Sequence, residues 1–177
     1  MPDTTNDTAY SRLSIFLHWM AAILVIALFA THEGARGSAA FVFHVSGGAI
    51  AGVFLLWRVA HRVRHGMAPA PDQAWLFTVA SKIVFWGFLA AIVVVVVTGY
   101  LSPWSVGRAI DIYGLFSLPS PLSANRDLHE FVEELHEIAG QLFVPLLALH
   151  LLGAAKHYFF DRDGVVRRMF RASDTGV

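Results

Sequence analysis

The chain has 177 residues, of which 56% are hydrophobic and only 15% are charged, and its net charge at pH 7 is zero. With a mean hydropathy of +0.57, it is too apolar for a soluble domain of ordinary proportions, and the balanced charge gives no sign of nucleic-acid binding. The absence of cysteine excludes disulfides and iron–sulfur clusters. The sequence therefore indicates an integral membrane protein in contact with lipid.

Four apolar segments follow one another along the chain. Each reaches the length of about 20 residues that a helix needs to cross about 30 Å of hydrocarbon. We therefore predict an all-α fold, an integral membrane four-helix bundle, formed by a single domain over residues 10–171. Polar tails, 1–9 and 172–177, flank this domain. The predicted spans are residues 13–31, 41–60, 75–100 and 131–160.

Lys and Arg are distributed unequally between the two sides that the spans define. An even number of spans puts both termini on one side, and basic residues favour the cytoplasmic side. The predicted side of the termini carries Arg12, Arg58, Arg62, Arg64, Lys156, Arg162, Arg167, Arg168 and Arg171. The other side carries Arg36, Arg108 and Arg126. We therefore predict that both termini are cytoplasmic.

The histidines are the most informative polar residues. Four lie at segment ends, where interfacial water can solvate them: His32, His61, His65 and His129. Four others fall inside the predicted spans: His18, His44, His136 and His150. Ionisable side chains in the hydrocarbon are costly, and they usually face the bundle interior and pair or serve a site.

Helical geometry sorts these four histidines into two levels. The fourteen residues from His136 to His150 return to within about 40° of the same face, about 21 Å along the axis. His44 lies near the outer end of its span and is level with His136, whereas His18 is level with His150. The sequence therefore predicts two pairs, His44 with His136 and His18 with His150.

Neutral imidazole is a good ligand for haem iron, and a helix bundle can supply ligands to both faces of a planar cofactor. Two haems of b type would account for all four residues. Interhelical hydrogen bonding is the structural alternative. Zinc fits poorly with two histidines alone, although Glu133, Glu134 and Glu137 flank His136.

Small residues accompany the outer pair of histidines. Ser46, Gly47, Gly48 and Gly52 follow His44, and Gly140 lies four residues after His136. Such positions allow the backbone to approach either a flat macrocycle or a neighbouring helix closely.

Sequence motifs over residues 10–171 carry a resemblance to a known family. They are "YSRLSIFLHWMAA", "FHVSGGAIAGVFLLWRVAHR", "TGYLSPWS" and "LHEIAGQLFVPLLALHLLGAAKHYFFDRDGVVRRM". Through them the chain resembles the bacterial cytochrome b561 family. This resemblance implies a di-haem membrane cytochrome of the bacterial inner membrane, with axial ligand pairs His18/His150 and His44/His136.

Members of that family move single electrons across the membrane, commonly to or from quinone, and one branch oxidises superoxide on the outer side. The resemblance therefore implies an oxidoreductase that couples an outer-side donor, such as superoxide, to the quinone pool. Two other interpretations stay open. One is an electron-relay or anchor subunit that docks a separate periplasmic or cytoplasmic redox protein, and the other is a non-redox transporter or scaffold without haem.

Residues near the two surfaces have expected roles. His157, two turns after His150, is expected to bind quinone or handle its proton, or to contact a haem propionate. Arg58 and Lys82 are long cations at or inside the membrane edge and are expected propionate partners. Lys156 and Arg12 lie around the same site. Arg36, Arg108 and Arg126 on the outer side, near a 28-residue connection from Ser102 to His129, are expected to solvate the loop or to steer an anionic donor.

Overall fold

The computed structural model describes residues 10–66 and 73–170, so the predicted tails lie outside the described residues. The helices are α1 (Arg12–Thr31), α2 (Ala39–Val42), α3 (Gly48–His65), α4 (Trp75–Ser105) and α5 (Arg126–Ala155). Two π-helical segments, η1 (Phe43–Gly47) and η2 (Lys156–Asp161), continue α2 into α3 and extend α5. Two short strands, β1 (Ile110–Ile112) and β2 (Phe116–Leu118), and a 3₁₀ turn, η3 (Arg167–Met169), complete the order.

The predicted all-α membrane bundle is confirmed, because four continuous helical stretches are long and apolar enough to cross a bilayer. The first, Arg12–Thr31, agrees with its predicted span, and the other three are longer than the apolar segments predicted from the sequence. The second runs over Ala39–His65, the third ends at Ser105 and the fourth spans Arg126–Asp161. Polar turns continue each of these three helices beyond its apolar part, and hydropathy alone detects only the part that suits hydrocarbon.

The helix boundaries follow from local capping. Ser11 and Ser38 accept hydrogen bonds from the backbone N–H groups three residues later, and Asn125 does the same at the start of α5. These side chains satisfy N–H groups that have no partner inside the helix. At the end of α3, Gly66 has a φ of +63° and its N–H bonds to the carbonyl of Arg62. A left-handed backbone there costs glycine little.

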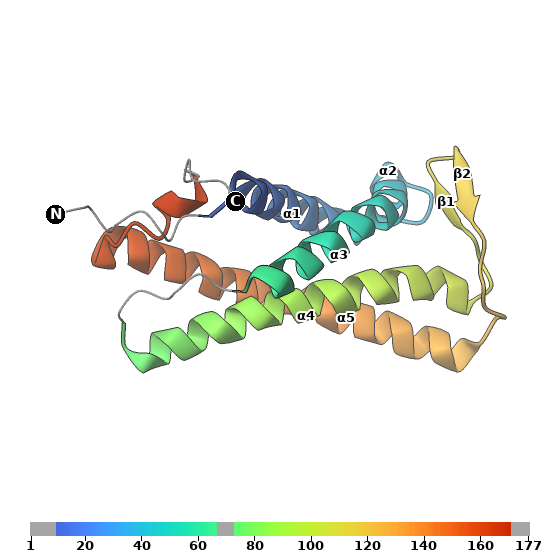
Figure 1. Ribbon diagram of the computed structural model, residues 1–177. Helices are drawn as coiled ribbons and strands as arrows, with labels where there is room; N and C mark the ends of the chain where they lie inside the picture. Colours follow the sequence, from blue (N-terminus) through green and yellow to red (C-terminus); the bar gives the residue numbers. More distant parts are fainter. Residues whose placement is uncertain (1–9, 67–72, 171–177) are drawn as a thin grey trace.

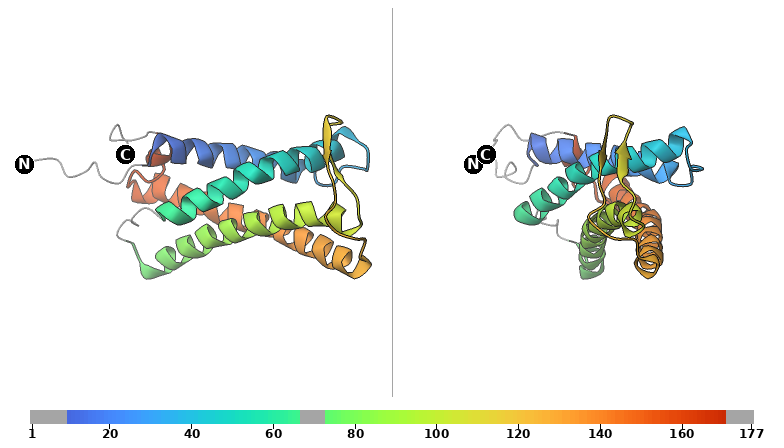
Figure 2. Two further views of the ribbon diagram at one scale, coloured as in Figure 1. Left: turned by 45° about the vertical axis from the view of Figure 1, so that its right-hand side comes forward. Right: turned by 90° about the vertical axis from the view of Figure 1, so that its right-hand side faces the viewer.

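The helices form an elongated bundle with two distinct ends (Figure 1). We call one the hairpin end, where the α1–α2 connection, β1, β2 and the start of α5 lie. The other is the tail end, where α1 begins and α5 finishes. The two strands stand across the hairpin end in a second view (Figure 2). The start of α1 and the end of α5 therefore lie at the same end of the bundle.

The hairpin replaces most of the predicted long loop. The connection between α4 and α5 covers residues 106–125, because both helices extend into the predicted 28-residue stretch. Ile110 pairs with Leu118 and Ile112 with Phe116 in antiparallel register. Ile110 and Ile112 are buried and pack against Ala49 of α3. The hairpin thus lies over the start of α3 as a fixed cap.

Close helix contacts depend on small residues. A Cβ at Gly52 would meet Val96 Cγ1 at 2.9 Å, and one at Gly87 would meet Leu146 Cδ2 at 2.8 Å. These glycines allow α3 and α5 to approach α4. The buried cluster at the centre comprises Ala21, Leu55, Ala91, Ile92, Val96 and Phe143.

Candidate functional site

The pair nearer the hairpin end is formed by His44 of η1 and His136 of α5. Their ring centroids are 6.1 Å apart and their planes are nearly perpendicular, at 85°. His44 Nδ1 donates to the carbonyl of Leu28 at 2.9 Å. His136 Nδ1 lies 2.9 Å from the hydroxyl oxygen of Thr98. With both Nδ1 atoms occupied in this way, the Nε2 atoms are the nitrogens that remain for a ligand.

The pair nearer the tail end is formed by His18 of α1 and His150 of α5. Their ring centroids are 6.0 Å apart, with an interplanar angle of 55°. His18 Nδ1 lies 3.2 Å from Nη2 of Arg58. A guanidinium only donates, so Nδ1 is the acceptor in this contact. His150 packs edge-on against Phe88, at 5.9 Å between centroids.

Both pairs have the spacing that a metal between two imidazoles requires. Two imidazole nitrogens that bind one ion from opposite sides, each at about 2 Å, bring the ring centroids to roughly 6 Å apart. A Cβ added at Gly140 or Gly153, near His136 and His150, would meet no described atom within 4 Å. The donor set and the open backbone beside it therefore fit a planar group with two axial imidazoles.

All four small residues noted near His44 are already in contact with protein, Gly48 through the side chain of Leu28. A Cβ at Gly47 would meet the hydroxyl of Tyr113 at 2.9 Å, and Gly52 faces Val96 and Tyr100. The hydroxyl of Ser46, which is 2% exposed, donates to the carbonyl of Asp111 at 2.8 Å. These contacts hold η1, and with it His44, against the hairpin. Their role is protein packing, whereas Gly140 leaves open space.

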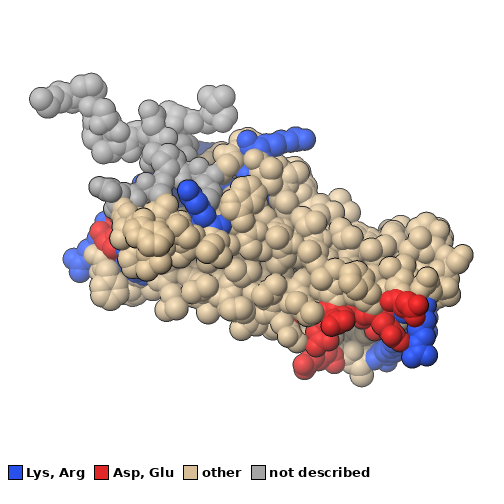
Figure 3. Space-filling view, turned by 90° about the horizontal axis from the view of Figure 1, so that it is seen from below, with Lys and Arg blue, Asp and Glu red and all other residues tan. Residues whose placement is uncertain are grey.

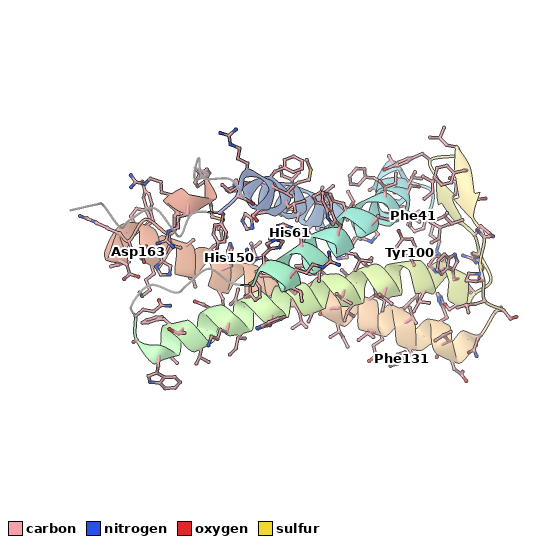
Figure 4. The ribbon with its side chains drawn as sticks, viewed as in Figure 1. Phe41, His61, Tyr100, Phe131, His150 and Asp163 are labelled. Atoms are coloured by element: carbon pink, nitrogen blue, oxygen red, sulfur yellow. The ribbon has the colours of Figure 1, made fainter. Side chains whose placement is uncertain are left out.

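A basic and polar group surrounds the tail-end pair. Ser14 Oγ is 3.2 Å from His61 Nε2, and Arg62 donates to the hydroxyl of Tyr10 at 3.1 Å. His61 and His150 lie on the same half of the molecule in Figure 4. A small cavity of about 40 Å³ is lined by Tyr10, Ser14, His18, Arg58, His61, Arg62 and Met169. These cations and hydroxyls suit the carboxylates of an anionic cofactor.

The two predicted propionate partners differ in position. Arg58 contacts His18 directly. Lys82 is exposed on α4 and makes no hydrogen bond or ion pair with any residue in the two described ranges. Arg58 therefore lies at the candidate site, beside His18, whereas the role of Lys82 stays a prediction.

His157 lies in η2, and carboxylates hold its ring. Nδ1 is 2.7 Å from Asp163 Oδ2 and 3.2 Å from Asp161 Oδ2. Lys156 Nζ is 2.5 Å from the same Asp161 oxygen. The α-helical spacing that relates His157 to His150 ends at Ala155, where the π-helical segment begins. His157, Asp161 and Asp163 are close enough to bind a metal ion, but Lys156 and hydrogen bonds already satisfy their charges.

Asp163 lies just after the last membrane-spanning residue, and its pKa is lowered from the ordinary 3.8. Burial acts against this shift, because it raises the pKa of a carboxyl. The N–H of Val165, which donates to Oδ1 at 3.1 Å, and the bond with His157 outweigh burial. The carboxylate form therefore holds the end of η2 in place.

Replacing Asp163 with asparagine is expected to lower stability at neutral pH by about 1 kcal/mol, through loss of a charged hydrogen bond. A carboxyl with a lowered folded pKa stabilises the protein above its unfolded pKa, and this stabilisation is lost as the pH falls through the folded pKa. Thermal unfolding of the two proteins should thus differ at neutral pH and converge once the pH has fallen below the folded pKa of Asp163, which lies under its ordinary 3.8. A difference that is independent of pH would contradict the assignment.

The remaining histidines have local roles. His32 stacks on Phe29, and His65 bonds to the carbonyl of His61 on its own helix. His129, expected at a segment end, lies in the first turn of α5, where Nδ1 contacts Ser105 and Nε2 is 3.3 Å from Glu133. Unlike the two pairs, none of these three faces an imidazole on another helix within the described residues.

An apolar groove elsewhere in the bundle does not include any of these histidines. It has a volume of about 590 Å³ between α3, α4 and the hairpin, and its lining is almost entirely apolar. The lining residues are Ala49, Ile50, Val53, Phe54, Trp57, Tyr100, Ile112, Phe116 and Leu118. Without metal-binding side chains, this groove is separate from the candidate site.

Sequence reasoning missed the hydrogen-bond acceptors of the hairpin-end imidazoles, His44 and His136. Thr98 sits in the apolar run "IVVVVVTGY", where a threonine ordinarily bonds to its own helix. It does so here, donating to the carbonyl of Val94 at 2.6 Å, and also contacts His136. The only available signal was a single hydroxyl in an otherwise apolar stretch.

The architecture and the paired imidazoles define the class of helical membrane proteins whose core can hold planar metal cofactors. Comparison with protein families gives the particular family. The family model described as prokaryotic cytochrome b561 matches residues 9–172. The chain therefore belongs to the prokaryotic cytochrome b561 family, which binds haem b and serves in membrane electron transfer.

Curated relatives agree with this family. The chain is 27% identical to cytochrome b561 homolog 2 of Escherichia coli K12, over all of both chains. It is 24% identical to the "Probable superoxide oxidase CybB" of Yersinia pestis, over 90% of this chain and 94% of that protein. It is 22% identical to cytochrome b561 homolog 1 of Escherichia coli K12, over 90% of this chain and 96% of that protein.

Proposed function

We propose that this protein transfers electrons across the bacterial inner membrane through two haems b, between an outer-side donor and the quinone pool. The observation that carries the proposal is the presence of two facing imidazole pairs, at 6.0 and 6.1 Å, toward opposite ends of one bundle. His18 and His150 would bind one haem, and His44 and His136 the other.

When bound, haem supplies a one-electron couple, and two axial histidines favour electron transfer over oxygen binding. The chain supplies the rest of the site. α5 provides one imidazole to each pair, so the spacing of His136 and His150 sets the distance between the two centres. In this structure His18 Nδ1 accepts from Arg58, so its proton lies on Nε2. Iron binding at Nε2 would put that proton on Nδ1, and Arg58 would then donate to a propionate instead, with its positive charge still beside the tail-end pair.

The distribution of basic residues supports an orientation with the tail end in the cytoplasm. The hairpin end then faces the outer side, and the quinone site lies near His157 at the cytoplasmic surface. His157 has a carboxylate partner at 2.7 Å in Asp163, a pairing suited to moving a proton to or from a quinone oxygen.

Superoxide is the proposed donor, because a relative that matches 90% of this chain is named a probable superoxide oxidase. The net reaction would convert two superoxide anions, one quinone and two protons into two molecules of oxygen and one quinol. Two electrons leave superoxide and both enter the quinone, which takes up the protons. His44 and His136 would hold the haem nearer the proposed donor, and His18 and His150 the haem nearer the proposed quinone site.

The charge of the hairpin end favours a second candidate, an electron-relay subunit that docks a basic redox protein. Arg126 is already paired with Glu130 at 2.7 Å, and acidic groups outnumber basic ones. Figure 3 shows acidic side chains gathered over this end of the molecule. The acidic residues in 32–38 and 106–137 are Glu33, Asp111, Asp127, Glu130, Glu133, Glu134 and Glu137, and the basic ones are Arg36, Arg108 and Arg126.

Rapid mixing distinguishes the two candidates. The purified oxidised protein is mixed with superoxide, reduction is followed in the visible spectrum, and a short-chain ubiquinone is then added. The proposed function predicts reduction by superoxide and reoxidation by quinone, with a superoxide rate that rises with salt as the acidic surface is screened. Reduction only by a basic redox protein, at a rate that falls with salt, would favour the relay. A protein without haem b would overturn both.

A further inference from the structure

The side chain of Thr98, on α4, contacts both a backbone carbonyl of its own helix and His136 of the hairpin-end pair. Thr98 is only 3% exposed. The hydroxyl is 2.6 Å from the carbonyl oxygen of Val94, which accepts its hydrogen. The oxygen lone pairs are thus left to face His136 Nδ1 at 2.9 Å. Because the hydroxyl hydrogen is already used, His136 is the donor in this contact, and the backbone carbonyl of Val95 is a second acceptor for the same ring.

The next residue, Gly99, forms the rest of the surface against which the His136 ring packs. A Cβ added at Gly99 would lie 3.4 Å from His136 Cε1. This distance is at the short end of ordinary van der Waals contact, so the His136 ring packs directly against the backbone of α4. Thr98 and Gly99 therefore fix both the proton and the position of one imidazole.

From this geometry we infer that Thr98 is a positioning residue, which keeps the proton of His136 on Nδ1 and lowers the reduction potential of the haem at the hairpin end. The inference rests on the proposed function, in which His136 Nε2 binds that haem. A hydrogen bond from the distal nitrogen of a ligand histidine raises its basicity. A more basic ligand stabilises the more positively charged, oxidised iron.

The tail-end pair is built in the opposite way. His18 Nδ1 faces the guanidinium of Arg58, whereas His44 and His136 face the oxygen atoms of Leu28 and Thr98. A nearby cation disfavours the more positive oxidised centre. The two environments would therefore give the hairpin-end haem the lower potential, so that electrons entering there move inward spontaneously.

Thr98→Val removes the hydroxyl while keeping the branched shape of the side chain. Anaerobic redox titration, followed in the visible spectrum, is expected to show a higher potential for the haem that is lost in His136→Ala. We expect up to about a tenfold change in its reduction equilibrium, equivalent to 59 mV for one electron. Thr98→Ser should restore the wild-type value. Ser81→Ala is the matched control, because Ser81 lies on the same helix and bonds only to the carbonyl of Phe77.

If Thr98→Val binds haem poorly, the haem content of the variants is measured in place of the reduction potential. Loss of one haem in both Thr98→Val and Thr98→Ala, with retention in Thr98→Ser, would support the inference, because only the hydroxyl distinguishes these proteins. Wild-type potentials in Thr98→Val, or haem loss in Thr98→Ser as well, would overturn it. The haem content of the wild-type protein tests the proposed function separately, since two haems b are required before the variants are compared.

Discussion

The wild-type protein is expected to bind two haems b, and His136→Ala only one. The physical reason is that an axial imidazole contributes directly to iron binding, and no other described histidine faces His44 at comparable distance. His44→Ala should remove the same haem, and His18→Ala or His150→Ala the other. Pyridine haemochrome absorbance per mole of purified protein measures the loss.

Double variants test the pairing itself. The effects of substitutions at one site do not add. His44→Ala combined with His136→Ala should therefore lose no more haem than either substitution alone. His44→Ala combined with His18→Ala should lose both haems. His65→Ala is the control, because this exposed residue at the end of α3 bonds only within its own helix. Two haems in every single variant would mean that the pairs have a structural role.

The helices and the grouping of the histidines could be read from sequence because each depends on a simple regularity. Apolar length identifies a membrane-spanning helix. The fourteen-residue spacing on α5 places His136 and His150 near one face, and depth then brings them level with His44 and His18. The structure brings together the members of each predicted pair, although haem binding by these residues stays a prediction.

The local environment of each imidazole could not be predicted in this way. His44 and His157 both lie in π-helical segments, which no apolar periodicity reveals and which often mark functional sites in helices. The contacts of His136 with Thr98 and of His157 with Asp163 depend on side-chain direction at an interface or after a helix end. Sequence spacing gives only the face of a regular helix, so it stops short of these contacts.

The charge at the hairpin end shows a second limit of sequence reasoning. Counting basic residues predicts orientation and draws attention to Arg36, Arg108 and Arg126 as anion guides. Their effect depends on their neighbours, and Arg126 is paired with Glu130. An acidic surface around them would slow an anionic donor, so these arginines could act only locally on superoxide.

His157→Ala is expected to slow the reoxidation of the pre-reduced protein by a short-chain ubiquinone about 10- to 100-fold, with both haems retained. A positioned histidine that transfers a proton contributes rate increases of about this size or larger. Asp163→Asn should slow the same step, because the carboxylate 2.7 Å away holds the imidazole ring in its orientation. Stopped-flow absorbance measures the rate. Tyr158→Phe is the control, since Tyr158 is exposed and its ring only packs on Phe159. Wild-type rates in His157→Ala would place the quinone site elsewhere in the protein and leave the His157–Asp163 bond as an anchor for the end of η2.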